Sequence, residues 1–369
     1  MTNGLLPEGL RDRLPPEAEA AGSILRAVLD CVATHGYRRV APPLAEFEEE
    51  LAGRLKSARS RDLLRFVDPV SQRTLALRPD ITAQIGRIAT TRMAGDARPL
   101  RLSYGGPIMK LKATQLRPER ELTQAGAELV GSESVAAALE IITMAIESLA
   151  ATGVGNITLD LTLPDLVDVL AAGPWPLSAD RLDAVKAALD AKDAGALLAE
   201  DAKAYLPLIS AAGPVDASVL QLRALGLGAA VEMRLSALEA IAEALGTVAR
   251  ITLDPTERHG FEYQSWMGFS LFGDGFTGEA GRGGSYTILH ADGHEEPAIG
   301  FSLFLDPLVD AGLMQVKVRR VFVPLDAPAG AGAKLRGEGW VTVAAICANC
   351  DAAALGCTHR LTDGVPVAL

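Results

Sequence analysis

The segment RPERELTQAGAELVG at 117–131 constrains the fold more than any other part of the chain. It is typical of a strand, a turn and a second strand, and the period of two along the second strand places Gln124 and Glu128 on one face. The RPDIT motif upstream adds the carboxylate of Asp80 and the hydroxyl of Thr82. If the two segments are adjacent, this sheet floor suits a small ligand with an ammonium or imidazolium group. The alternative is a solvated strand face.

Composition limits the classes of partner. With 369 residues, 49% of them hydrophobic and 22% charged, the chain can bury a full core and has room for two or three domains. Its 35 basic and 46 acidic residues give a net charge of −11, which provides no general attraction for phosphate backbones or anionic membrane surfaces. The sequence shows neither a signal-peptide pattern nor a run of ~20 apolar residues. We therefore expect no nucleic acid and no membrane as partners, and a cytoplasmic location.

The cysteines are Cys31, Cys347, Cys350 and Cys357, too few and too clustered for a secreted disulfide framework. The CxxC pair at 347 and 350, followed by Cys357 and His359, could hold zinc. However, the pair ends an apolar strand-like run, and no second CxxC follows it. Buried or incidental thiols are therefore the expected state, and no metal is expected.

Several segments carry the periodicity of helices and strands. Apolar residues at helical spacing predict a helix that stops at Gly36 and another at 132–153, capped by Ser132 or Ser134. The glycine-rich GEAGRGGSY is neither a GxGxxG motif nor a Walker loop, which favours a tight turn beside a pocket. The other expected elements are a hairpin turning at 68–72, a strand at 100–104 ended by the glycines and proline at 105–107, strands at 157–163 and 267–272, and a helix at 303–312.

The order of five motifs points to a family. LALRPDITAQIGRIA, RLSYGGPIMK, RPERELTQAGAELVG, GRGGSY and PAIGFSLFLDPL together resemble the catalytic core of a histidinyl-tRNA synthetase, a class II synthetase, over residues 6–313. The resemblance implies an α+β fold, with an antiparallel sheet flanked by helices. It implies a core at 1–163 and 248–313, a helical insertion at 164–247 and a small C-terminal α/β segment at 318–369. It also implies a dimer contact at Pro43, although an ordinary helix, turn and strand would fit the same residues.

The family's phosphate-binding residues are altered. Amino-acid activation needs arginines that neutralise the phosphate charge of the transition state, each worth ~2–4 kcal/mol. The resemblance aligns those arginines, and the glutamate and tyrosine near them, with Lys110, Lys112, His259, Gln264, Ser285 and Pro307. The loss of several such groups together would lower the rate of amino-acid activation by many orders of magnitude. We therefore expect a scaffold that cannot adenylate efficiently.

A non-catalytic branch of this family has these properties, namely the regulatory subunits of ATP phosphoribosyltransferase. The resemblance implies no catalytic residues, no cofactor, a self-dimer, and assembly with a short catalytic subunit that the chain activates and makes sensitive to histidine. The implied histidine contacts are Asp80, Thr82, Gln124 and Glu128, with Arg120 and Tyr286 at the margin. Two alternatives stay open: a divergent histidinyl-tRNA synthetase or other amino-acid-activating ligase, and a sensor of uncharged tRNA.

Overall fold

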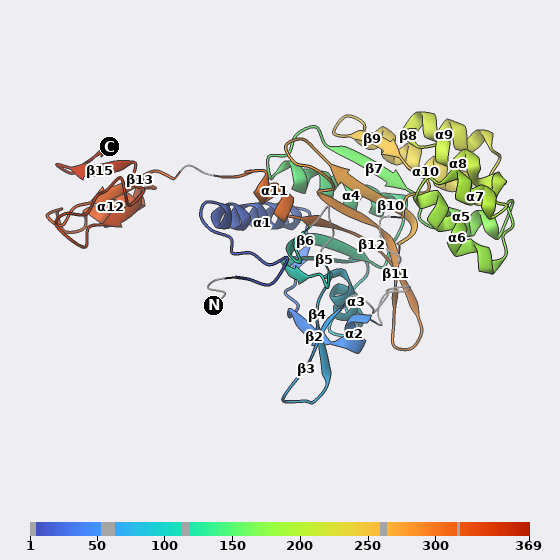
Figure 1. The fold of residues 1–369 in the computed structure, drawn as a ribbon, viewed down its shortest axis with the longest axis horizontal. Coiled ribbons are helices and arrows are strands. Elements are labelled where there is room, and N and C mark those ends of the chain that lie inside the picture. Colours follow the sequence, from blue (N-terminus) through green and yellow to red (C-terminus); the bar gives the residue numbers. More distant parts are fainter. Residues whose placement is uncertain (1–4, 53–62, 113–117, 259–263, 316–317) are drawn as a thin grey trace. The chain divides into compact units, whose positions relative to one another are not determined.

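The computed structural model describes residues 5–52, 63–112, 118–258, 264–315 and 318–369. The chain divides into two compact units, Met1–Met314 and Gln315–Leu369 (Figure 1). Within the described residues, no helix combines the length and the apolar composition that a membrane crossing needs.

A large mixed sheet organises the first unit. In the described residues it has nine strands in the order β1-β5-β6-β12-β11-β10-β7-β9-β8. The six from β5 to β7 are antiparallel to one another, whereas β1 and β9 lie parallel to β5 and β7. This confirms the expected α+β fold. The strands are β1 Arg38–Arg39, β5 Leu100–Met109, β6 Glu121–Val130, β12 Glu295–Phe304, β11 Gly281–Leu289, β10 Gln264–Phe272, β7 Thr158–Thr162, β9 Arg250–Leu253 and β8 Gly213–Pro214.

Two long helices cover one face of this sheet. Helix α1, Glu17–Thr34, ends before Gly36, whose φ of 82° suits glycine at a helix end. Helix α4, Val135–Ala150, starts at Ser134, whose side chain accepts a hydrogen bond from the Ala137 amide as an N-cap. The two helices contact each other and both pack on β6. Their apolar side chains and those of the sheet form one continuous buried core, as expected from their helical spacing.

The opposite face carries a smaller layer. Helix α3, Thr82–Thr90, follows the RPDIT motif and packs against the sheet through Ile81 and Ile85. A separate three-stranded sheet and the short helix α2, Glu48–Ala52, lie beside α3. Its strands, among the described residues, are β2 Ala45–Phe47, β4 Thr74–Leu77 and β3 Leu64–Val67, and the β3–β4 hairpin turns where the sequence predicted it.

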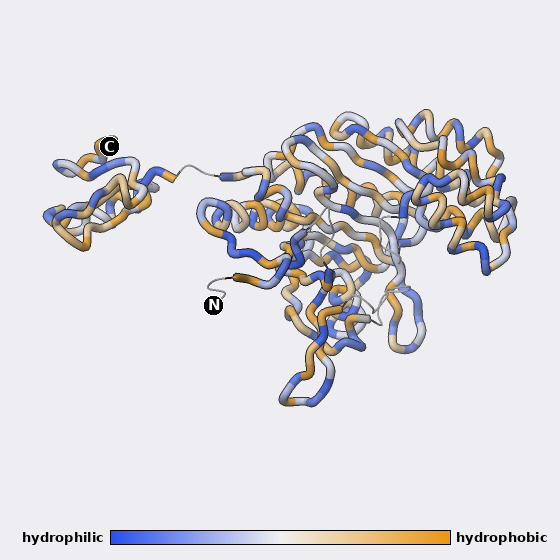
Figure 2. The backbone as a smooth tube through the Cα atoms, in the orientation of Figure 1, coloured by the Kyte–Doolittle hydropathy of each residue, from blue (hydrophilic) through white to orange (hydrophobic). Residues whose placement is uncertain are grey.

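Residues 164–247 form the expected group of small helices between β7 and β9. Hydrophobic residues are interspersed with hydrophilic ones along these helices (Figure 2), and the buried ones join the core behind the main sheet. The chain leaves the sheet at β7 and returns at β9, which lies parallel to β7. The helices are α5 Leu166–Ala171, α6 Ala179–Asp190, α7 Ala194–Ala199, a 3₁₀ turn Lys203–Tyr205, α8 Leu206–Ser210, α9 Val215–Ala224 and α10 Ala229–Leu245.

The second unit is a small α/β structure. Its described residues give a four-stranded sheet in the order β14-β13-β15-β16, with one helix, α12. The end of the chain forms the antiparallel pair β15–β16. The elements are β13 Arg320–Val323, α12 Ala331–Gly337, β14 Val341–Ala344, β15 His359–Thr362 and β16 Val365–Ala368.

The expectation that Cys347 and Cys350 are thiols is wrong. Cys347 and Cys350 form a disulfide rather than two thiols, and Cys347 is exposed. The pair therefore offers no thiolate to zinc. Cys31 and Cys357 are free thiols.

Two glycine-rich segments lie inside strands rather than at turns. Gly105 and Gly106 continue β5 in register with β6, so the expected strand end at these residues is wrong. A Cβ atom would lie 2.7 Å from Leu25 Cδ1 at Gly105 and 2.6 Å from Arg78 Nη2 at Gly106. The missing side chains thus let α1 and Arg78 approach the strand. GEAGRGGSY likewise leads into β11, because glycines there let neighbouring backbones come close.

Two other elements have boundaries that differ from those expected from the sequence. The first strand expected within 117–131 is absent from its described part, since 118–120 precede β6 without regular structure. The helix expected at 303–312 is shorter, because β12 runs to Phe304 and α11 spans only Asp306–Asp310.

Candidate functional site

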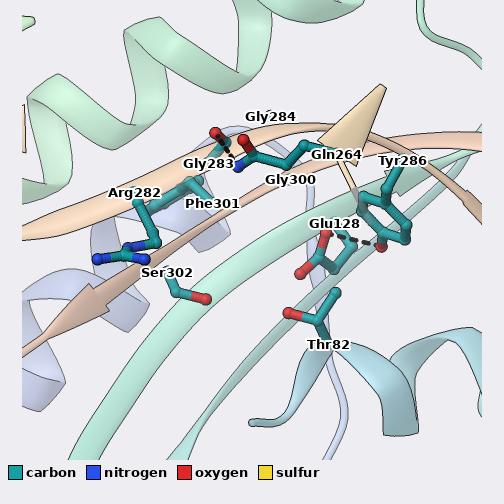
Figure 3. Close-up of a pocket in the computed structure, with 10 residues that line it drawn as sticks. All are labelled: Thr82, Glu128, Gln264, Arg282, Gly283, Gly284, Tyr286, Gly300, Phe301 and Ser302. Carbon is teal, nitrogen blue, oxygen red and sulfur yellow. Dashed lines mark hydrogen bonds between the residues drawn. The ribbon is translucent and has the colours of Figure 1, made fainter. Parts of the chain in front are cut away.

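A buried carboxyl group lies at the centre of the candidate site. Glu128, on β6, is 1% exposed and accepts a hydrogen bond from each of two tyrosine hydroxyls. Tyr104 of β5 donates to Oε1 at 3.0 Å. Figure 3 shows the second contact, in which Tyr286 of β11 donates to Oε2 at 2.9 Å. Burial raises the pKa of Glu128 from 4.5 to about 8, although the two tyrosines act in the opposite direction. The carboxyl group is therefore mostly protonated at neutral pH.

Gln124 connects the sheet to the start of α3. Its Oε1 accepts a hydrogen bond from the Ile81 amide at 2.9 Å. Its Nε2 donates to Asp80 Oδ2 at 3.0 Å and to Ser302 Oγ at 2.6 Å. Asp80 in turn accepts a hydrogen bond from the Thr82 amide at 2.7 Å. The RPDIT motif and β6 thus form one polar network, as the adjacency expected from the sequence requires.

A pocket opens beside this network, and we call it the Glu128 pocket. Four strands, β6, β10, β11 and β12, and the first residue of α3 form its walls (Figure 3). Gly300 on β12 leaves room for Glu128, because a Cβ on Gly300 would overlap its carboxylate. The lining residues are Thr82, Glu128, Gln264, Arg282, Gly283, Gly284, Tyr286, Gly300, Phe301 and Ser302.

The expected histidine contacts do not all lie together. Thr82, Glu128 and Tyr286 line the Glu128 pocket, while Asp80 and Gln124 belong to the network that supports it. The alternative of a solvated face is wrong, since Gln124 is fully buried as well. Arg120 lies elsewhere.

Arg120 is engaged with the N-terminal segment and the end of β5. Its Nε donates to the Lys110 carbonyl at 3.2 Å, and its backbone amide donates to the Gly9 carbonyl at 2.8 Å. It is not among the residues that line the pocket.

Tyr104, Arg282 and Ser302 belong to the site but were not singled out from the sequence. Tyr104 hydroxyl contacts both Glu128 and Ser302 Oγ, the latter at 2.8 Å. Arg282 lines the pocket and pairs with Glu279. The period of two along RLSY at 101–104 places Leu102 and Tyr104 on one strand face, and this could have indicated Tyr104.

The residues at the family's phosphate-binding positions make structural contacts. Lys110 Nζ donates to the Pro79 carbonyl at 2.8 Å. Pro307 is in the first turn of α11, where proline is tolerated because the first amides have no helical partner. Ser285 is buried and donates to the Met267 carbonyl at 3.2 Å. Gln264 Nε2 donates to the Gly283 carbonyl at 2.9 Å. Lys112 is exposed, and His259 lies outside the described residues.

The fold and this pocket define a protein of the histidyl-tRNA synthetase type. The family model described as Histidyl-tRNA synthetase matches residues 9–308. A solved structure described as an ATP phosphoribosyltransferase regulatory subunit/histidyl-tRNA synthetase from Bacillus halodurans C has the same fold, with a TM-score of 0.81 at 22% identity over 96% of each chain.

Curated relatives narrow the assignment. The ATP phosphoribosyltransferase regulatory subunits of Paramagnetospirillum magneticum and Rhodospirillum centenum are each 40% identical to the chain over 98% of its length, covering 97% and 95% of theirs. The chain belongs to the family of ATP phosphoribosyltransferase regulatory subunits. It is accordingly a regulatory subunit rather than a catalytic one.

Proposed function

We propose that the chain assembles with a short catalytic ATP phosphoribosyltransferase subunit, activates it and makes it sensitive to histidine in the first step of histidine biosynthesis. One observation carries the proposal. Glu128 and Tyr286 in the polar pocket are buried and hydrogen-bonded to each other. By contrast, Lys110 and Pro307, which the family resemblance aligns with phosphate-binding arginines, make a backbone contact and begin a helix. Such a molecule can bind an amino acid without activating it. Two relatives are named ATP phosphoribosyltransferase regulatory subunits, which supports a role beside a catalytic subunit.

We place the effector histidine in the Glu128 pocket. A cationic ammonium or imidazolium group next to Glu128 would favour the carboxylate over the protonated acid, because an opposite charge stabilises the ionised form. Tyr104 and Tyr286 already donate hydrogen bonds to the carboxylate oxygens. Asp80 would act through Gln124 rather than directly, because its Oδ2 is engaged by the Gln124 amide.

Feedback then requires a difference in affinity between two assembled states. Histidine need only bind the inactive complex more tightly than the active one. A coupling free energy of ~1–3 kcal/mol is enough to change the activity of the complex measurably. The building unit would be a self-dimer that uses the segment around Pro43. The Pro43 carbonyl accepts a hydrogen bond from Gln84 of α3 at 2.7 Å, which links that segment to the helix that starts at the pocket.

The test is phosphoribosyl transfer from phosphoribosyl pyrophosphate to ATP. The short catalytic subunit from the same organism is assayed alone and with this chain, and histidine is titrated into the mixture. We expect much higher activity in the mixture, and a decrease as histidine rises. If the chain has no effect on the catalytic subunit and instead exchanges pyrophosphate into ATP with histidine, the proposal is wrong.

The site of histidine is tested separately from the activation. The Glu128→Gln variant should form the same complex by size-exclusion chromatography but need a higher histidine concentration for inhibition. Unchanged inhibition would place the effector site elsewhere and leave the activation proposal intact.

A further inference from the structure

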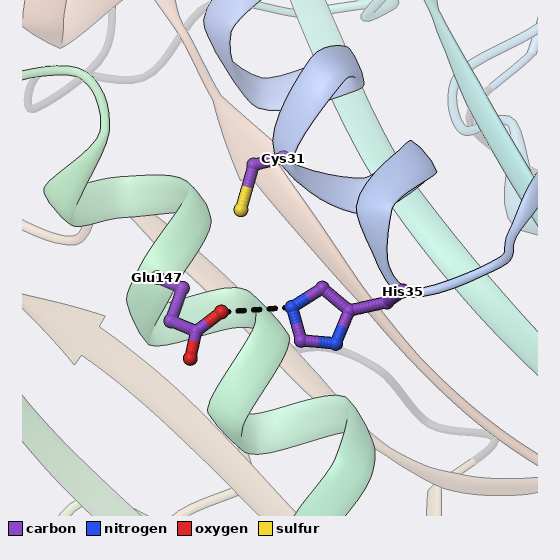
Figure 4. Close-up of side chains that lie close together, drawn as sticks. All are labelled: Cys31, His35 and Glu147. Carbon is purple, nitrogen blue, oxygen red and sulfur yellow. Dashed lines mark hydrogen bonds and ion pairs between the residues drawn. The ribbon is translucent and has the colours of Figure 1, made fainter.

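A second cluster of reactive side chains lies outside the Glu128 pocket. Cys31 is in the last turn of α1, His35 is the C-cap residue of that helix, and Glu147 is in the last turn of α4 (Figure 4). One ligand atom from each residue lies within 4.8 Å of the other two. His35 Nε2 and Glu147 Oε2 are 2.7 Å apart. The role proposed for the Glu128 pocket uses none of these groups.

The geometry follows from the packing of the two helices. Residues four apart lie on the same side of a helix, so Cys31 and the capping residue His35 point the same way. Helix α4 contacts α1 and brings Glu147 to them. Cys31 and His35 are partly buried and Glu147 is exposed, so the cluster lies at the protein surface and a solvated ion can reach it.

We propose that Cys31 Sγ, His35 Nε2 and a Glu147 carboxylate oxygen bind a zinc ion, with water as the fourth ligand. A thiolate, an imidazole and a carboxylate are the protein ligands that Zn²⁺ takes, and this mixture is poorly suited to Mg²⁺ or Ca²⁺, which prefer oxygen alone. Tetrahedral zinc bonds of ~2.0–2.3 Å place ligand atoms roughly 3.3–3.8 Å apart. Small side-chain rotations reach that arrangement from the present one. On binding, zinc displaces one proton from the thiol to solvent.

A neighbouring hydroxyl supports a thiolate at this position. Ser148 follows Glu147 on α4, is fully buried, and its Oγ has no hydrogen-bond partner in the described part of the chain. A metal-bound thiolate would give this buried donor an acceptor. Ser148 is thus a positioning residue for the sulfur ligand.

The bound ion would tie the end of α1 to the end of α4. These helices pack on the face of the sheet opposite the Glu128 pocket. Because a ligand that binds only the folded state stabilises it by mass action, zinc should raise the melting temperature of the chain as its free concentration exceeds the dissociation constant.

The experiment uses the full chain stripped of metal with a chelator, in a background in which Cys347 and Cys350 are both changed to serine. Co²⁺ is titrated in, and the near-ultraviolet thiolate band and visible tetrahedral bands are recorded before Zn²⁺ is added to displace it. We expect one ion per chain, both sets of bands, and their loss on addition of Zn²⁺. Native mass spectrometry gives the stoichiometry independently.

Variants identify the ligands. Cys31→Ser and His35→Gln should each weaken Zn²⁺ binding roughly 100-fold or more, and Ser148→Ala about tenfold. His290→Gln is the matched control, because His290 Nε2 also pairs with a carboxylate, Glu296, at 2.9 Å but is not in a described cluster with a cysteine. Cys357→Ser controls for the other free thiol.

Melting in chelator verifies that each variant is folded. A thiolate band that persists in Cys31→Ser, equal binding by wild type and His35→Gln, or no binding of Zn²⁺ at equimolar concentration would each overturn the proposal.

Discussion

Lys110 donates a hydrogen bond from Nζ to the carbonyl oxygen of Pro79, with the two atoms 2.8 Å apart. The side chain therefore links the end of β5 to the RPDIT motif rather than extending toward a nucleotide. Arg78, the neighbour of Pro79, reinforces the same link, since its Nε donates to the Pro107 carbonyl at 2.8 Å. A residue that aligns with a catalytic arginine in the synthetases thus has a structural role here.

Restoring an arginine at this position should not restore catalysis. We expect neither wild type nor Lys110→Arg to show histidine-dependent exchange of pyrophosphate into ATP. Pro307 and Ser285 still lack phosphate-binding groups, and each missing donor costs about 10²–10³ in rate. Exchange should remain about 10⁴-fold or more below that of an authentic histidyl-tRNA synthetase assayed in parallel. Measurable exchange by Lys110→Arg would mean that a single residue disables the chain.

Glu128→Gln should weaken histidine binding about 10- to 100-fold, because a charge-assisted contact is replaced by a neutral one. Isothermal titration calorimetry of the isolated chain at pH 8 measures this directly. At that pH about half of the carboxyl groups are already ionised in the absence of ligand, given a pKa of about 8.

Glu140→Gln is the matched control for that variant. Glu140 also accepts a hydrogen bond from a tyrosine, Tyr37, at 2.8 Å, but it lies on α4 behind the sheet. Its substitution should leave histidine affinity unchanged. Equal histidine affinities of wild type, Glu128→Gln and Glu140→Gln would show that histidine does not bind in the Glu128 pocket.

The same carboxyl group should make stability depend on pH. Its pKa is raised from 4.5 to about 8 on folding, so its contribution is fully present below pH 4.5 and is lost as pH rises to about 8. Relative to Glu128→Gln, the wild-type chain should lose up to about 5 kcal/mol of unfolding free energy over that range. Urea unfolding of both proteins from pH 5 to 9 gives the difference. A difference that does not change with pH would show that Glu128 is ionised in the folded chain.

Gly300→Ala should destabilise the chain by ~1–3 kcal/mol and weaken histidine binding, because the new methyl group would overlap the Glu128 carboxylate. Gly22→Ala is the control. No atom lies within 4 Å of a Cβ built on Gly22, which is inside α1, so this change should stabilise the chain by ~0.5–1 kcal/mol. Thermal unfolding compares the two. We expect the changes in unfolding free energy of the two variants to have opposite signs. A Gly300→Ala variant as stable as wild type would mean that Glu128 can leave its position freely.

The alternation along β6 was enough to place Gln124 and Glu128 on one buried face. The period of two holds because the strand is continuous and one face meets α3. Arg120 had been implied only by the family resemblance. It precedes β6, which begins at Glu121, and its side chain contacts the Lys110 carbonyl instead of the pocket.

Packing between residues far apart in the sequence determined several structural features that local sequence patterns did not indicate. Gly105 and Gly106 have poor strand propensity, yet they lie in β5 because Leu25 and Arg78 need the space. The alternation along β5 could place Tyr104 on one strand face, but only the pairing of β5 with β6 brings its hydroxyl to Glu128. The zinc cluster was missed because its third member, Glu147, is 112 residues from His35 in sequence.

The wall of the Glu128 pocket formed by Gly283, Gly284 and Gly300 consists of main-chain atoms. Point mutation can narrow such a wall, at a cost in stability, but cannot reshape it. A lineage that exchanged one small effector for another would therefore vary the side chains that line the pocket, such as Thr82 and Gln264. The sheet would keep its shape while the ligand preference of the pocket changed.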